Sequence, residues 1–201
     1  ALSQWSDCIL LSMRVLVVNA YPVTHPDSSV VQQAIDMLHA QGHEIEHLPL
    51  EADEFATMMT AAERTAYETN APLLAEETRA SAGSVQAADA LLFCYPTTLF
   101  GPPPRLKSWL ERVMVIDVAF VFDDKQRVRP GLLNIRRIGV ITTTPHSKRV
   151  TLRARDLGYR TFMRTLRLNC HPLCRRTFVR MPTQAPAGRY VDRFHRALRG
   201  W

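Results

Sequence analysis

The sequence predicts a doubly wound α/β domain, in which a mostly parallel β-sheet is covered by helices on both faces. Three observations support this fold class. Short runs of Val, Ile and Leu recur along the 201 residues, as in strands that are buried on both sides. Segments with apolar residues at helical spacing alternate with these runs. Loops that contain Pro, Gly, Ser and Thr connect the two kinds of element.

The expected elements follow one another from residue 14 onward. We expect strands at residues 14–19, 43–50, 88–95, 137–141 and 176–179. We expect helices at about residues 30–38, in two pieces within 51–83 on either side of Pro72, and at 106–114, 150–168 and 186–198. A hairpin within residues 118–133 interrupts the alternation.

Five strands separated by helices are typical of the flavodoxin-like strand order 2-1-3-4-5. In such a sheet, ligands bind beyond the carboxyl ends of the strands, where the strand order reverses. That point lies between the first and third strands. The loops at residues 20–29, 96–104 and 142–148 should therefore converge on one ligand site.

The composition is that of an ordinary globular protein, with 46% hydrophobic and 22% charged residues. No run of 18 apolar residues is present, so we expect no membrane insertion. Residues 1–12 lack the basic start of a signal peptide, and we interpret them as an N-terminal extension. Residues 13–201 are expected to form one domain, and the cytoplasm is the expected compartment.

Charge is distributed unevenly along the chain. Residues 1–124 contain 6 Lys and Arg against 17 Asp and Glu, whereas residues 125–201 contain 19 against 2. Such a basic region can attract nucleic acid, a membrane surface, phosphorylated cofactors or the acidic face of a second copy. Because the basic residues alternate with a helical apolar pattern and carry no nucleic-acid motif, we expect a solvated helix face and no nucleic-acid partner.

The cysteines give little support for a metal site. Cys170 and Cys174 flank His171, but a zinc site usually needs a second ligand pair, and none stands at a suitable spacing. We therefore expect no metal, and reduced, partly buried thiols.

The first of the three loops has features of an anion site. His25, Ser28 and Ser29 precede a helix, whose first N–H groups and positive dipole end favour negative charge. The simpler interpretation is a helix cap. The glycine-rich fingerprints of the Rossmann and P-loop types are absent, which argues against a dinucleotide or triphosphate bound in those ways.

The second loop predicts a rigid wall of backbone. Leu99, Phe100 and Gly101 are followed by three prolines, which are tolerated at a helix start because the N–H groups there are unpaired in any case. Such a wall suits a flat aromatic ring. The simpler interpretation is a stiff connector.

The segment YPTTLFGPPPRLKSWLERV (residues 95–113) resembles the NAD(P)H:quinone oxidoreductase family of flavodoxin-like flavoproteins. That family typically reads Phe-Pro-x-x-Trp-Phe-Gly-x-Pro-Ala-x-Leu-Lys-x-Trp-x-Asp-Arg. The matching residues are Pro96, Phe100, Gly101, Pro103, Leu106, Lys107, Trp109 and Arg112. The likeness extends to residues 14–29 and 131–144 and covers about two thirds of the chain.

The resemblance implies a flavin-binding domain with non-covalent FAD or FMN, the first loop favouring FAD. It also implies NADH or NADPH as electron donor, a quinone-like acceptor and a homodimer. The flavin phosphates would lie along His25, Ser28 and Ser29. The ring would contact the other two loops, at Pro96, Thr97, Thr98, Leu99, Phe100, Gly101, Thr142, Thr143, Thr144 and Pro145.

The chain also departs from the family pattern. Leu99 replaces a tryptophan, and Thr144 and Pro145 replace two glycines. The family's Tyr and His proton partners have no clear counterparts, so His146 is the first catalytic candidate and Tyr159 the second. A weakly catalytic flavoprotein subunit of a potassium-efflux-type partner stays open as the alternative function.

Overall fold

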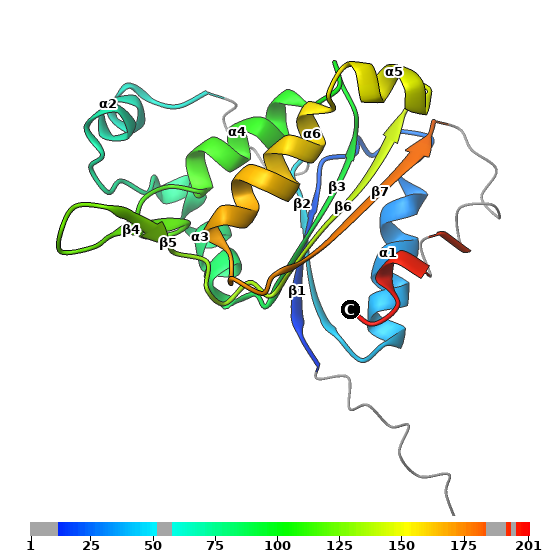
Figure 1. Cartoon of the computed structure of the whole chain (residues 1–201), viewed down its shortest axis with the longest axis horizontal. Coiled ribbons are helices and arrows are strands. Elements are labelled where there is room, and N and C mark those ends of the chain that lie inside the picture. The colour runs from blue at the N-terminus through cyan, green and yellow to red at the C-terminus, as the bar shows by residue number, and fades with distance from the viewer. Residues whose placement is uncertain (1–11, 52–57, 184–191, 194–195) are drawn as a thin grey trace, which may run out of the picture.

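Five parallel strands form one sheet in the order β2-β1-β3-β6-β7 (Figure 1). This computed structural model describes residues 12–51, 58–183, 192–193 and 196–201, so nearly all of the expected N-terminal extension lies outside the described residues. The strands are β1 (Arg14–Asn19), β2 (Glu44–Pro49), β3 (Ala90–Pro96), β6 (Arg137–Thr144) and β7 (Arg175–Pro182). The predicted fold class and the strand order 2-1-3-4-5 are confirmed.

Helices cover both faces of this sheet, with α1 on one side and α3, α4 and α6 on the other (Figure 1). The helices are α1 (Ser29–Ala40), α2 (Ala61–Thr69), α3 (Glu76–Ala87), α4 (Pro104–Val113), α5 (Lys148–Arg153) and α6 (Leu157–Arg160). The antiparallel strands β4 (Phe120–Phe122) and β5 (Val128–Pro130) confirm the predicted hairpin. Pro72 lies between α2 and α3, as predicted.

The burial of the strands explains their sequences. Residues 90–95 of β3 are all buried, because helices cover both sides of this central strand. The outer strand β2 is partly exposed and alternates instead. In the parallel register, Asn19 of β1 pairs with Cys94 of β3, and Pro96 of β3 pairs with Thr143 of β6. The carboxyl ends of β1, β3 and β6 therefore meet at one edge.

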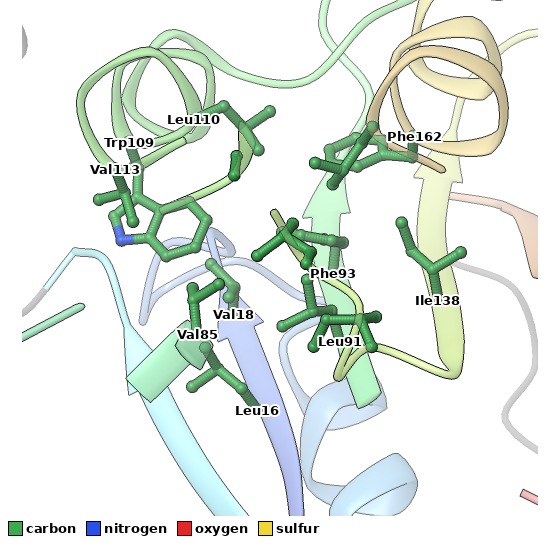
Figure 2. Close-up of a cluster of buried hydrophobic side chains, with 14 of the residues drawn as sticks. Leu16, Val18, Val85, Leu91, Phe93, Trp109, Leu110, Val113, Ile138 and Phe162 are labelled. Atoms are coloured by element: carbon green, nitrogen blue, oxygen red, sulfur yellow. The ribbon is translucent and has the colours of Figure 1, made fainter. Parts of the chain in front are cut away.

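The core on the α4 side fixes the helix that follows the second loop (Figure 2). Trp109 of α4 is fully buried and meets Phe93 of β3 edge-on, with ring centroids 6.2 Å apart. Its indole N–H donates to Ser81 Oγ of α3 at 3.1 Å. Phe162, which follows α6, packs on the same Phe93 ring at 4.5 Å. This aromatic cluster holds α4 and α6 against β3.

On the opposite face, the C-terminus packs beside α1. The Trp201 ring covers Gly139 of β6 so closely that a Cβ there would lie 2.5 Å from the indole. Trp201 donates its indole N–H to Thr177 Oγ1 at 3.1 Å. Residues 196–198 are helical, and much of the helix predicted over 186–198 lies outside the described residues.

The prediction of one basic helix over residues 150–168 is wrong. The segment is divided into α5, α6, a π-helical turn (Thr161–Thr165) and a 3₁₀ turn (Leu166–Asn169). Arg155 has a left-handed backbone (φ 54°), which ends the α5 segment, and the Asp156 carboxylate caps α6 at the N–H of Tyr159. The break directs α6 toward β3.

A membrane-spanning helix is not found in the described parts of the chain, where every helix is too short or too polar to cross a bilayer.

Candidate functional site

The second loop forms a strained two-residue turn. Thr98 and Gly101 exchange two backbone hydrogen bonds, of 3.0 and 2.8 Å, around Leu99 and Phe100. Both central residues have positive φ, at 44° and 60°. Turns of this kind favour Asn and Gly, and a bulkier residue in this region costs roughly 1–3 kcal/mol. Backbone strain of this size is typical of ligand sites. We refer to residues 98–101 as the ring-wall turn, after the wall for a flat ring that the sequence predicts here.

The ring-wall turn exposes apolar surface beside free donors. Leu99 is 87% exposed, whereas Phe100 is half-buried. Within the described residues, the backbone N–H groups of Leu99 and Phe100 form no hydrogen bond. The Phe100 carbonyl accepts from the Gly158 N–H at 3.2 Å, which ties the turn to α6. Free N–H donors next to an apolar surface fit the edge of a flat heteroaromatic ring such as a flavin.

Three threonines that the sequence places in a loop are the last residues of β6. Thr142, Thr143 and Thr144 are all buried. Their hydroxyls are used inside the molecule: Thr142 Oγ1 lies 2.7 Å from Thr97 Oγ1, and Thr143 Oγ1 accepts from Tyr21 at 3.1 Å. Thr144 Oγ1 accepts from a backbone N–H at 3.3 Å. β-Branched residues extend strands readily, which explains the longer β6, and the loop itself begins at Pro145.

These threonines hold the three strand ends together. The Thr97 N–H donates to the Thr143 carbonyl at 2.8 Å, so Pro96 and Thr97 continue beside β6. Burial raises the pKa of Tyr21, which keeps its hydroxyl protonated as a donor to Thr143. The ring-wall turn therefore projects from strand ends at which the hydroxyls of Thr142, Thr143 and Thr144 already have hydrogen-bond partners. Contact between these hydroxyls and a flavin stays a prediction.

The first loop is ordered by its histidine. His25 Nδ1 accepts the Asp27 N–H at 3.1 Å, so Nε2 is the ring nitrogen that is left to donate to a ligand. The ring meets Tyr21 edge-on at 5.3 Å. At the N-terminus of α1, the Ser28 side chain makes no capping bond, and neither serine hydroxyl is hydrogen-bonded within the described chain. Both hydroxyls are therefore available to a ligand, and phosphate binding by Ser28 and Ser29 stays a prediction.

The two catalytic candidates lie in different surroundings. The exposed His146 ring stacks on Phe100, with centroids 4.4 Å apart and an interplanar angle of 22°. His146 thus joins the ring-wall turn to the loop after β6. Tyr159 lies on α6, where its ring meets Phe178 edge-on at 5.3 Å. The structure brings His146, but not Tyr159, into contact with the predicted ring wall.

Two surface hollows flank the β6–α5 loop and share the side chains of Lys148 and Arg180. The first contains His146 and Pro145. The second is lined by Tyr159 and several basic residues, and has a volume of about 650 Å³. Sequence reasoning did not single out any basic residue of these hollows. The excess of Lys and Arg after residue 124 was the signal for them, but it could not indicate which side chains share a concave surface.

Tyr95 was not predicted as a site residue, although it is the next-to-last residue of β3, the strand that leads into the ring-wall turn. Its ring packs on Phe162 at 5.6 Å, and its buried hydroxyl has no hydrogen-bond partner among the described residues. A Cβ at Gly158 would lie 2.3 Å from that hydroxyl. Only glycine therefore lets α6 approach β3 this closely. Burial also raises the pKa of Tyr95, so the hydroxyl is neutral.

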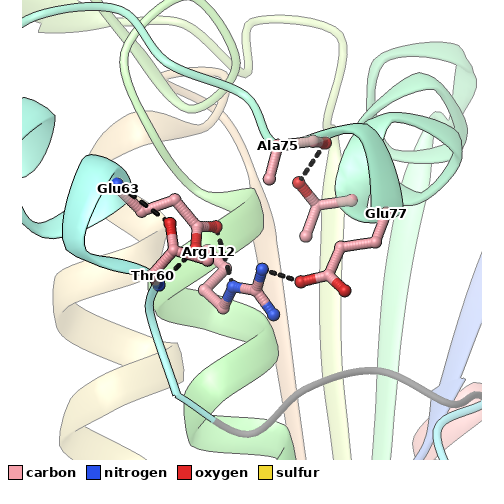
Figure 3. A network of polar contacts seen from close by, with 6 residues as sticks. Thr60, Glu63, Ala75, Glu77 and Arg112 are labelled. Carbon is pink, nitrogen blue, oxygen red and sulfur yellow. Dashed lines mark hydrogen bonds and ion pairs between the residues drawn. The ribbon is translucent and has the colours of Figure 1, made fainter.

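Away from this edge, a buried ion-pair network connects three helices (Figure 3). Arg112 of α4 is fully buried; its Nε lies 2.8 Å from Glu63, and its terminal nitrogen pairs with Glu77. Glu63 also forms a capping box with Thr60 at the start of α2. The cavity next to this network has a volume of about 160 Å³, which is too small for a flavin.

The thiols of Cys94, Cys170 and Cys174 are free and buried, while Cys8 lies outside the described residues. Across the described ranges, no group of three or more His, Cys, Asp or Glu side chains is arranged to hold a metal ion.

Comparison with known proteins places this chain in a family. A family model described as having a flavodoxin-like fold matches residues 13–171, and the chain belongs to that family. The chain is similar to the NAD(P)H:quinone oxidoreductase from Methanothermobacter marburgensis, with 19% identity, a TM-score of 0.74, and coverage of 94% of this chain and 96% of that one. Both comparisons therefore support the flavodoxin-like fold.

Two other similar structures contain FMN. One is an FMN-dependent NADH-azoreductase from Bacillus anthracis, with 13% identity, a TM-score of 0.63, and coverage of 91% of this chain and 94% of that one. The other is general stress protein 14 from Treponema denticola, with 16% identity, a TM-score of 0.54, and coverage of 91% and 93%. At these identities the likeness is one of fold. No curated protein matches the chain.

Proposed function

We propose that this protein is a flavin-dependent oxidoreductase that passes two electrons from NADH or NADPH to a quinone or a similar acceptor. The observation that carries the proposal is the ring-wall turn, in which two strained, non-glycine residues present free N–H donors beside exposed apolar surface. This turn stands at the sheet edge where ligands of doubly wound folds bind. The family and the named quinone reductase and azoreductase support the same activity.

FMN is the flavin that the comparisons favour. Two of the similar structures contain FMN, whereas the preference for FAD drawn from the first loop has no support in them. In the proposed site, the hydroxyls of Ser28 and Ser29 and the N-terminus of α1 would hold the phosphate. His25 would donate through Nε2 from the same loop.

A bound flavin supplies the chemistry of accepting a hydride from the nicotinamide and passing two electrons onward. The chain's own contribution is position and polarity. The N–H groups of Leu99 and Phe100 would donate to the ring edge, with Pro96 and Thr97 below them and Gly101 closing the turn. Pro145 would border the ring from the β6 side, since the threonine hydroxyls before it already have partners.

His146 is the residue that we propose to hold a proton near the ring, because its own ring stacks on Phe100. Tyr159 faces the second hollow and would meet the donor or the acceptor instead. We also propose a homodimer that works in the cytoplasm. The alternative function, a regulatory subunit of a potassium-efflux system, gains no support from the named proteins.

The proposal is tested by identifying the flavin and then following its reduction. The purified protein is incubated with FMN or FAD, freed of excess ligand and heated, and the released flavin is identified by chromatography. Reduction of the holoprotein by NADH and by NADPH is then followed at the flavin absorbance band, with and without a quinone. We expect FMN to be retained and reduced, and the quinone to reoxidise it. A protein that stays colourless with both flavins would overturn the proposal.

A further inference from the structure

The second hollow, which we call the basic hollow, lies between α5, α6 and β7. Its volume of about 650 Å³ is within the range of small-molecule sites. It is lined by Lys148, Thr151, Leu152, Arg155, Asp156, Tyr159, Arg160, Arg164 and Arg180. Five of these side chains are basic and one is acidic.

The single carboxylate of the basic hollow is already engaged. One oxygen of Asp156 accepts the Tyr159 N–H at 3.0 Å, and the other pairs with Arg180. The Arg180 guanidinium also lies over the Phe178 ring, 5.1 Å from its centroid. Arg180 is thus a fixed wall of the hollow, and Asp156 has little capacity left to neutralise other cations.

Four cations of the basic hollow therefore remain without an acidic partner. In the described part of the chain, no carboxylate lies within ion-pair distance of Lys148, Arg155, Arg160 or Arg164. Like charges that line one concave surface repel each other and focus a positive potential into it. Arg155 is in addition held with a positive φ. An arrangement that is unfavourable alone becomes favourable when a multiply charged anion binds.

The basic hollow is connected to the ring-wall turn through α6 and through the neighbouring hollow. The Gly158 N–H at the start of α6 donates to the Phe100 carbonyl of the ring-wall turn. Lys148 and Arg180 also line the neighbouring hollow, which contains His146. A ligand with a flat ring at the turn and a phosphate on an extended arm can therefore occupy both places.

We propose that the basic hollow binds the 2′-phosphate of NADPH and so selects this donor over NADH. The inference rests on the proposed function, since it assigns the donor of that reaction. A 2′-phosphate monoester adds about −1.5 to −2 charges at neutral pH. Arg160 and Arg164 supply planar donor groups that match phosphate oxygens, and Lys148 adds a point charge. NADH has no group that would engage these cations at the same place.

The hollow is tested without flavin chemistry by calorimetric titration with three nucleotides. Adenosine 2′,5′-bisphosphate carries the 2′-phosphate, adenosine 5′-monophosphate lacks it, and adenosine 5′-diphosphate carries a second phosphate at another position. We expect the 2′,5′-bisphosphate to bind about tenfold or more tightly than either of the others, because charge-assisted bonds are the strong ones. This preference should weaken as salt is raised.

Two double variants with the same change in charge locate the site. R160Q/R164Q removes two cations of the basic hollow, whereas R149Q/R153Q removes two exposed cations on α5 that do not line it. We expect the 2′-phosphate preference to disappear in the first and to persist in the second. Equal loss in both variants, or equal affinity for the 2′,5′-bisphosphate and the 5′-diphosphate, would overturn the assignment in favour of general surface charge.

The outcome can be separated from that of the flavin proposal. FMN binding is measured on the same preparations by quenching of flavin fluorescence. Binding of FMN without any 2′-phosphate preference overturns this inference and leaves the proposed function standing. A 2′-phosphate preference in protein that binds no flavin supports the hollow and overturns the proposed function.

Discussion

Arg112 and Arg180 both belong to ion pairs on the same side of the sheet, but their surroundings differ. Arg112 is fully buried among α2, α3 and α4 with two carboxylates. Arg180 pairs with Asp156, the single carboxylate that lines the basic hollow, and four further cations line the same hollow. The Arg112 network contains one cation and two carboxylates, whereas the basic hollow contains five cations and one carboxylate.

The difference separates a cation that stabilises the fold from cations available to a ligand. A buried ion pair is tolerated when its partners compensate it, and it then becomes costly to break. Lys148, Arg155, Arg160 and Arg164 of the basic hollow face solvent and repel one another, so we expect their removal to leave the fold nearly unchanged. Charge balance within each cluster, rather than the number of charges, indicates its role.

The largest effect is expected at Arg112. Arg112→Met leaves Glu63 buried beside an apolar side chain, and we expect the free energy of unfolding to fall by about 3–5 kcal/mol. The measurement is a urea titration followed by circular dichroism. The matched control is Arg79→Gln, which breaks an exposed pair with Glu76 and should change stability by less than about 1 kcal/mol. Similar losses of stability in Arg112→Met and Arg79→Gln would contradict the contrast between a buried ion pair that stabilises the fold and an exposed one that does not.

A smaller effect, confined to acid, is expected at Glu63. Burial alone would raise the pKa of this carboxyl, but hydrogen bonds from Arg112 and Thr60 outweigh it and hold the pKa below its usual value of 4.5. The ionised carboxylate therefore stabilises the fold above pH 4.5, and this contribution is lost as pH falls through the lowered pKa.

The test compares Glu63→Gln with the unmodified protein over a range of pH. The variant should be less stable at pH 7, and the difference should shrink as the pH falls below 4.5, because the carboxylate at position 63 becomes protonated only in the unmodified protein, while the other carboxylates titrate in both. Urea titrations at several pH values measure both proteins. A difference that stays constant with pH would mean that the carboxylate charge is not the stabilising feature.

The smallest effect on stability is expected in the basic hollow. R160Q/R164Q should leave the free energy of unfolding unchanged or raise it by up to about 0.5 kcal/mol, since it relieves repulsion between exposed like charges. Thermal unfolding with and without adenosine 2′,5′-bisphosphate is the measurement. A large loss of stability in the absence of ligand would show that these arginines serve the fold, as Arg112 does.

The sequence was sufficient for the parts of this protein that depend on local pattern. Unbroken apolar runs identified β1 and β3, and the residues Leu99 to Pro104 identified the position of the ring-wall turn. Both follow from burial on two faces and from the backbone limits of Gly and Pro. The location of this turn at the reversal of strand order then follows from topology.

Other features depend on contacts between distant segments and could not be predicted. The threonines after Ile141 resemble a loop until Tyr21 and Thr97 are seen to pair with them. Arg155 carries no local signal for its positive φ, so the division of the basic helix was missed. The basic hollow is lined by residues from both sides of that division together with Arg180 of β7. Long-range packing decides such features, and a single sequence does not display it.

The central claim is that the ring-wall turn forms the wall of a flavin site, and FMN titration of a turn variant tests it most directly. L99N/F100G replaces the two strained residues with those that the turn prefers, so it should be at least as stable as the unmodified protein. The control is Asn70→Gly, which changes another positive-φ residue, at the C-terminal end of α2 and outside the three loops of the proposed flavin site. We predict that L99N/F100G binds FMN at least about tenfold more weakly while Asn70→Gly binds it normally. Unchanged FMN affinity in L99N/F100G would contradict the account.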